Sequence, residues 1–171
     1  MKSRAGKLAK IAAIAFIAWM WFYAFVLAPR ESANNIADKE WSARAEATCS
    51  REASNRTSLA DLAKIDPKDP AVVRKKGEIV DLATDTIERQ VDAIEKDVPS
   101  TAKGRALVPE WIRDYRTYIS DRRDYADSLM TGTISEFAES QVEGVPISER
   151  IGKFARENHM PACQPPRDLQ A

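Results

Sequence analysis

The sequence of 171 residues is poor in the residue types that build most catalytic and metal sites. It contains one histidine, two cysteines and six glycines. Two cysteines and one distant histidine cannot complete a tetrahedral metal site, and GxSxG, HExxH and glycine-rich phosphate loops are absent. The histidine, His159, falls in a loop-like Asn-His-Met-Pro stretch. We therefore expect no catalytic residue, no metal and no cofactor, and we interpret the chain as not an enzyme.

The most prominent feature that the sequence does contain is a long apolar segment near the N-terminus. Residues 8–28 read LAKIAAIAFIAWMWFYAFVLA, and 18 consecutive residues from Ile11 to Ala28 carry no charge. As a helix, residues 8–28 would span roughly 31 Å, which matches a hydrocarbon core of about 30 Å. Lys10 near the start can extend its amine back to the headgroups. The segment predicts a transmembrane helix, with the lipid bilayer as its first partner.

Charge predicts the orientation of this helix. Four basic residues and no acidic residue precede the apolar run, whereas the chain beyond residue 28 holds 22 basic and 26 acidic residues. Because positive charge stays on the cytoplasmic side, we expect a cytoplasmic basic arm (1–7), a transmembrane helix (8–28) and an extracytoplasmic domain (29–171). This places the protein in the plasma or inner membrane as a single-pass signal-anchor protein.

A cleaved signal peptide is the competing interpretation of the same segment. Signal peptides have a shorter apolar region, of about 7 to 15 residues, and the best small-residue site here is followed directly by Pro29. The sequence thus favours a permanent anchor. Ala5, Ala9 and Ala13 recur at steps of four, a spacing that lets a second transmembrane helix approach closely, so a homo-oligomer through this face is a further hypothesis.

The two cysteines, Cys49 and Cys163, both fall on the outward side. An even number of cysteines in an oxidising compartment predicts a disulfide. Closing a loop of this length stabilises a fold by about 4 to 5 kcal/mol in the chain-entropy model. Two buried free thiols are the alternative.

The outer domain has helical periodicity and almost no strand signal, which predicts an all-α fold. One helix over about 30–64 should continue the transmembrane helix, and a second should cover 70–98. A third should begin at Pro109, a favoured first-turn residue, and a short fourth should be capped by Ser148. The apolar stripe of the second comprises Val73, Val80, Ala83, Ile87, Val91, Ile94 and Val98. Short connections predict an antiparallel up-down-up bundle with a disulfide-tethered C-terminal tail.

The most distinctive segment is residues 109–130. Its large side chains recur at steps of four and three, as in a heptad seam. Around them, charges of alternating sign indicate a solvated helix face and no nucleic-acid partner. We call the set the tyrosine seam: Trp111, Tyr115, Tyr118, Arg122 and Tyr125.

Arg122 within the seam needs a carboxylate or an aromatic face. Glu52 or Glu88 can supply the carboxylate, and the rings of Tyr118 and Tyr125 lie one turn away on either side. The seam has three interpretations: a buried core that fixes the helix register, an interface for a protein partner, or a small-molecule pocket.

Two function classes follow. In the first, the outer domain is an interaction or structural module for another membrane or envelope protein. In the second, it is an extracytoplasmic ligand-binding or sensory module. Because only about ten residues would lie inside the cell, such a module would have to signal through a lateral partner.

Overall fold

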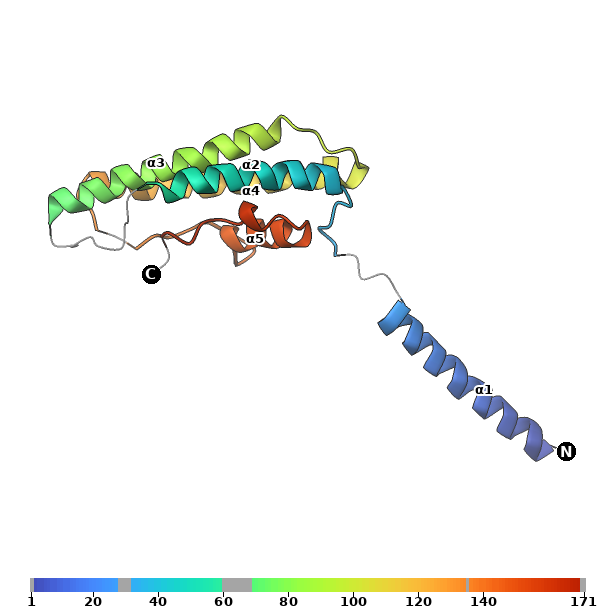
Figure 1. The fold of residues 1–171 in the computed structure, drawn as a ribbon. Coiled ribbons are helices and arrows are strands. Elements are labelled where there is room, and N and C mark those ends of the chain that lie inside the picture. Colours follow the sequence, from blue (N-terminus) through green and yellow to red (C-terminus); the bar gives the residue numbers. More distant parts are fainter. Residues whose placement is uncertain (1, 28–31, 60–68, 135, 170–171) are drawn as a thin grey trace. The chain divides into compact units, whose positions relative to one another are not determined.

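The computed structural model describes residues 2–27, 32–59, 69–134 and 136–169, without the side chains of residues 2–5 and 7–9. Within these ranges the chain is mostly helical, with five α-helices and one pair of two-residue strands. It divides into two compact units, residues 1–33 and 34–171 (Figure 1). The predicted all-α class is confirmed.

The first unit consists of helix α1 (Lys2–Phe22) and a π-helical turn η1 (Tyr23–Leu27). The 18 residues Lys10–Leu27 are long and apolar enough to cross a membrane, and none of them is buried within the protein. Ala13 is exposed, while the side chains of Ala5 and Ala9 lie outside the described residues. Pairing through these alanines therefore stays a prediction.

Helix α2 (Lys39–Thr57) is the first helix of the second unit. The prediction that it continues the apolar helix is wrong, because residues 32–38 are not helical. Ala37 has a φ of 54°, a left-handed conformation that breaks a right-handed helix. Asp38 then caps α2, with its Oδ1 accepting a hydrogen bond from the Trp41 N–H at 3.1 Å. The cap fixes where the helix begins.

Helix α3 (Pro70–Glu95) begins after an Asp69 cap and has proline in its first turn. Val98, predicted on its stripe, lies past the helix end and is 66 % exposed. The reason is Pro99, since the residue before a proline disfavours the helical conformation. The rest of the predicted stripe is buried: Val73, Val80, Ala83, Ile87, Val91 and Ile94. The predicted end of the preceding helix, near residue 64, falls outside the described residues.

Helix α4 (Ala102–Met130) begins earlier than the predicted start at Pro109, which is a correction. Thr101 caps it, its hydroxyl oxygen accepting a hydrogen bond from the Gly104 N–H at 2.9 Å. Pro109 lies inside the helix at an exposed position. A proline there removes one backbone hydrogen bond and crowds the carbonyl four residues before it, yet the helix continues to Met130.

Helix α3 packs against α2 and α4 (Figure 1) and runs antiparallel to both. The start of α2 meets the end of α3, where Trp41 Nε1 donates to the Asp97 carbonyl at 2.7 Å. Further along α2, Glu52 pairs with Arg89 of α3 at 3.2 Å. Helices α3 and α4 approach closely at Gly77, where a Cβ would lie 2.7 Å from Met130 Cγ.

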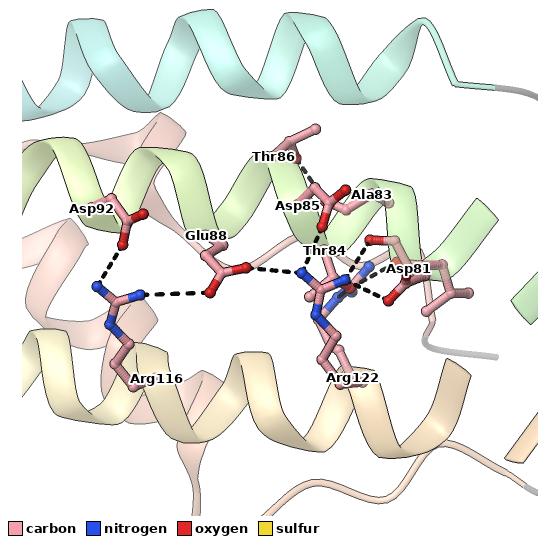
Figure 2. A network of polar contacts seen from close by, with 11 residues as sticks. Asp81, Ala83, Thr84, Asp85, Thr86, Glu88, Asp92, Arg116 and Arg122 are labelled. Atoms are coloured by element: carbon pink, nitrogen blue, oxygen red, sulfur yellow. Dashed lines mark hydrogen bonds and ion pairs between the residues drawn. The ribbon is translucent and has the colours of Figure 1, made fainter. Parts of the chain in front are cut away.

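A row of carboxylates on α3 faces two arginines of α4 (Figure 2). Arg116 donates to Asp92 at 2.6 Å, and Arg123 donates to Asp85 at 2.6 Å. Burial alone would lower the pKa of Arg123, but its bonds to the carboxylates raise it overall. The full row is Asp81, Asp85, Glu88, Asp92 and Glu95. Because these pairs are partly exposed, they set the register of α3 against α4 more than they add stability.

Two short strands, β1 (Gln141–Val142) and β2 (Val145–Pro146), form an antiparallel hairpin after α4. The turn residues Glu143 and Gly144 have φ values of 53° and 78°, the positive values typical of a type I′ hairpin turn. Strands this short leave no alternating pattern, which is why the sequence did not predict them.

Helix α5 (Ile147–Glu157) follows, and its predicted cap is wrong. Ser148 lies inside the first turn, where its N–H and hydroxyl both donate to the Glu139 carboxylate, at 2.8 and 2.9 Å. An acidic side chain is favourable at this positive helix end. Its buried face includes Ile151, Phe154 and Ala155.

The predicted disulfide is confirmed. Cys49 of α2 and Cys163 of the 3-10 turn η3 (Pro161–Cys163) are bonded and fully buried, with their Cα atoms 5.1 Å apart. Beside them, Trp111 stacks on Phe154 with ring centroids 5.0 Å apart. The bond ties the C-terminal end of the chain to α2 across the core.

Removing the disulfide should be among the most costly changes in this domain. We expect the double substitution Cys49→Ala/Cys163→Ala to lower the free energy of unfolding by about 4 kcal/mol, because the unfolded chain regains the freedom of a loop of over 100 residues. Urea unfolding of the full chain in detergent, with and without reductant, measures this. Reductant should destabilise the wild type and leave the double variant unchanged; equal stability of the two oxidised proteins would contradict the prediction.

The Asp38 carboxylate should make stability depend on pH. Burial alone would raise its pKa, but hydrogen bonds from the Trp41 N–H and from Ser100 outweigh burial and lower the pKa below the ordinary value of an aspartate. The charged form is therefore favoured in the folded state, so its contribution is complete above the unfolded pKa and is lost as pH falls through the folded pKa. We expect Asp38→Ala to cost about 2 kcal/mol at pH 7, and less in acid.

The matched control is Asp69→Ala, which removes the cap of α3 at an exposed position. Thermal unfolding of each variant and of the wild type from neutral to acidic pH gives the comparison. We expect Asp69→Ala to lower the free energy of unfolding by less than Asp38→Ala does. A cost for Asp38→Ala that stayed constant down to pH values below its folded pKa would argue against the charged cap.

Candidate functional site: the tyrosine seam and the C-terminal tail

The tyrosine seam lies almost entirely inside the domain. Trp111, Tyr115, Tyr118 and Arg122 are each at most 2 % exposed, while Tyr125 is half-buried. The steps of four and three place all five side chains on one side of α4. Of the three interpretations that the sequence left open, the structure therefore shows a buried seam, not a bare surface.

Helix α5 covers Trp111, whose Nε1 donates to the Ile151 carbonyl at 3.2 Å, and the C-terminal residues cover Tyr115, Tyr118 and Arg122. We call residues 164–169 the tail. The Tyr115 hydroxyl donates to the Cys163 carbonyl at 2.5 Å, and the Tyr118 hydroxyl donates to the Pro166 carbonyl at 3.2 Å. Arg122 then donates from both terminal nitrogens to the two Asp168 oxygens, each at 2.8 Å. Successive seam residues thus bind successive positions of the C-terminal segment.

Arg122 is held on the helix side as well. Its Nε donates to Thr84 Oγ1 of α3 at 3.0 Å, and its guanidinium carbon lies 5.7 Å from the Tyr118 ring centroid. Both helices are visible in Figure 2. Burial alone would lower the pKa of Arg122, but the bonds to Asp168 and Tyr118 raise it. The guanidinium is fully charged and has no exposed surface.

The predicted carboxylate partners of Arg122 are wrong. Glu52 bonds to Arg89, and Glu88 bonds to Arg123 at 2.9 Å. The predicted contact with the Tyr118 face is confirmed. The true partner, Asp168, lies in a tail with no helical period. One signal pointed toward it: the predicted disulfide returns the chain to the bundle only five positions before this residue.

A second arginine, Arg56 of α2, lies near the same place. It is half-buried and donates to Thr86 Oγ1 at 2.9 Å. Burial and the charge of Arg122 lower its pKa, while the charge of Asp168 raises it. The charge of Asp168 therefore acts on both guanidinium groups, although only Arg122 is bonded to it.

The chemistry of the site suits binding. Burial raises the pKa of both Tyr115 and Tyr118, so at neutral pH both phenols stay protonated and act as hydrogen-bond donors. His159 is exposed in the turn after α5 and far along the chain from the seam. Among the described residues, no group of three or more His, Cys, Asp or Glu side chains could hold a metal ion.

One hollow of about 350 Å³ between α4 and α5 is lined by Leu107, the seam residue Trp111 and Phe154 together with charged residues. The ion pair of Arg150 and Asp114, at 3.0 Å, belongs to its wall. Arg122 does not line this hollow.

Comparisons of the chain with protein-family models, with curated proteins and with solved structures find no match.

The ion pair of Arg122 and Asp168 should respond asymmetrically to substitution. Asp168→Asn leaves a buried guanidinium without its counter-charge, and we expect a loss of about 2 to 4 kcal/mol in unfolding free energy. The double variant Arg122→Met/Asp168→Asn removes the buried charge as well and should be more stable than Asp168→Asn alone.

Urea unfolding of the single and double variants forms a double-mutant cycle that isolates the pair. Asp124→Asn, at an exposed position of α4, is the control and should change stability by less than about 0.5 kcal/mol. A loss for Asp168→Asn as small as that of the control would show that the pair does not stabilise the domain.

Proposed function

We propose that this chain is a single-pass membrane protein whose extracytoplasmic domain is an interaction module for another membrane or envelope protein. The basic arm (1–7) lies in the cytoplasm, residues 8–28 span the bilayer, and residues 29–171 lie outside. The charge difference across the apolar helix supports this orientation. A buried disulfide that closes the domain supports an oxidising compartment.

One observation carries the interaction role: the seam binds an extended segment of chain. Two phenols donate to main-chain carbonyls, and an arginine binds a carboxylate in a bidentate manner. Phenols, indoles and guanidinium groups are the side chains enriched where proteins bind one another. The site holds donors and positive charge, which suit recognition of a peptide.

Purification from native membranes after mild crosslinking tests this function. We expect a companion protein in stoichiometric amount, and an intact mass near 19.1 kDa that includes the N-terminal helix. The wild type should be compared with a variant in which a flexible linker separates the apolar helix from the domain. Recovery of the chain only as a monomer would contradict the interaction role, and a mass lacking residues 1–28 would contradict the anchor.

A further inference from the structure

We propose that the tyrosine seam is a receptor for polyproline-II peptides that carry a carboxylate, and that the tail occupies it within the chain. The partner it fits is a protein with an extended, proline-containing segment followed by an acidic residue. This inference rests on the proposed interaction function and names the surface and the kind of partner.

The conformation of the tail is the first argument. Gln164 has φ −77° and ψ 147°, which are polyproline-II values. Pro165 and Pro166 follow, and their rings fix φ near that of the same helix. Neither proline has an N–H, so this part of the tail offers only carbonyl groups to its surroundings. The seam residues that face the tail, Tyr118 and Arg122, supply hydrogen-bond donors.

The spacing of the contacts is the second argument. Tyr115 and Tyr118 bind the carbonyls of Cys163 and Pro166, which are three residues apart. Cys163 ends the 3-10 turn η3 and stays fixed by the disulfide, so of these two carbonyls only that of Pro166 belongs to the tail. Main-chain carbonyls are common to all peptides, and the Tyr118 phenol therefore recognises the peptide backbone. Arg122 adds selectivity, because its paired bonds to Asp168 require a carboxylate two residues further on.

Contacts outside the tail also hold the receptor side. Arg122 is fixed by Thr84, and the Tyr118 ring packs edge-on against Phe137 with centroids 6.1 Å apart. The tail side is less enclosed: the Asp168 side chain is 23 % exposed, against none for Arg122. A rigid set of donors facing a surface-exposed ligand is the arrangement expected of a binding groove.

Charge favours an acidic peptide. Arg122 has no exposed surface, so a segment that takes the place of the tail must bring a carboxylate to it, as Asp168 does. Cys163 stays fixed by the disulfide, so only the tail has to leave.

The test uses the full chain in detergent micelles and the peptide acetyl-Gln-Pro-Pro-Arg-Asp-amide, which copies residues 164–168. In the Asp168→Asn variant the resident tail is weakened. We expect this peptide to bind in a saturable way, to raise the melting temperature, and to shift the amide resonances of α4 near Tyr118 and Arg122. Replacing the peptide's aspartate with asparagine should weaken binding at least tenfold, and replacing its prolines with alanine should also weaken it.

The wild type is measured in parallel with excess peptide, so the test stands even where Asp168→Asn folds poorly. The matched control is Asp168→Asn combined with Arg122→Met, which should lose the preference for aspartate over asparagine. Absence of binding to both wild type and Asp168→Asn would overturn the proposal and leave the seam as a structural clamp. A concentration-dependent dimer that the peptide dissolves would assign the groove to a second copy of the chain and also overturn it.

These outcomes are separable from those of the proposed function. A companion that still co-purifies with Asp168→Asn/Arg122→Met would support the interaction role while excluding the seam as its surface. Peptide binding without any companion in native membranes would support the groove alone.

Discussion

Arg122 carries a positive charge at a place that water does not reach, and such a charge costs several kcal/mol unless it is neutralised where it lies. The neighbouring helices provide Thr84 and Tyr118, which satisfy donors but bring no negative charge. The counter-charge is Asp168, which arrives from 46 positions along the chain. The tail must therefore lie along α4. The phenols of the seam then have carbonyl acceptors, and the aromatic residues beneath are shielded from water.

The disulfide makes this arrangement reachable. Cys163 is fixed against α2, so the chain has only five residues, or about 17 Å when extended, in which to place Asp168. Without that bond, the ion pair would have to hold the C-terminal segment against the entropy of a long loop. With the disulfide in place, Asp168 has to reach Arg122 over only five residues of chain. The covalent bond and the ion pair thus act on opposite ends of one short segment, and the two phenols bind between them.

Features that repeat along the sequence were predictable, and features set by tertiary contacts were not. The buried stripe of α3 and the one-sided seam follow from helical periodicity, and the disulfide follows from two cysteines on one side of the apolar helix. The starts of α2 and α4 could not be predicted in this way, because the caps Asp38 and Thr101 are single residues whose role depends on neighbouring turns. Pro109 is equally compatible with a first turn and with an exposed face. Asp168 lies in a segment without helical periodicity, so no sequence pattern marks it as the partner of Arg122.

The same tether that helps Arg122 hold the tail also limits what can displace it. The tail is held by one hydrogen bond from Tyr118 and by the ion pair with the buried Arg122, and a short linker keeps it at an effective concentration in the millimolar range. A free peptide of equal affinity would have to match that concentration. A partner held in the same membrane, with its own proline-containing segment tethered nearby, would reach it without binding more tightly. Under the proposed function, the anchor would supply local concentration, and the groove would supply selectivity for an extended acidic segment.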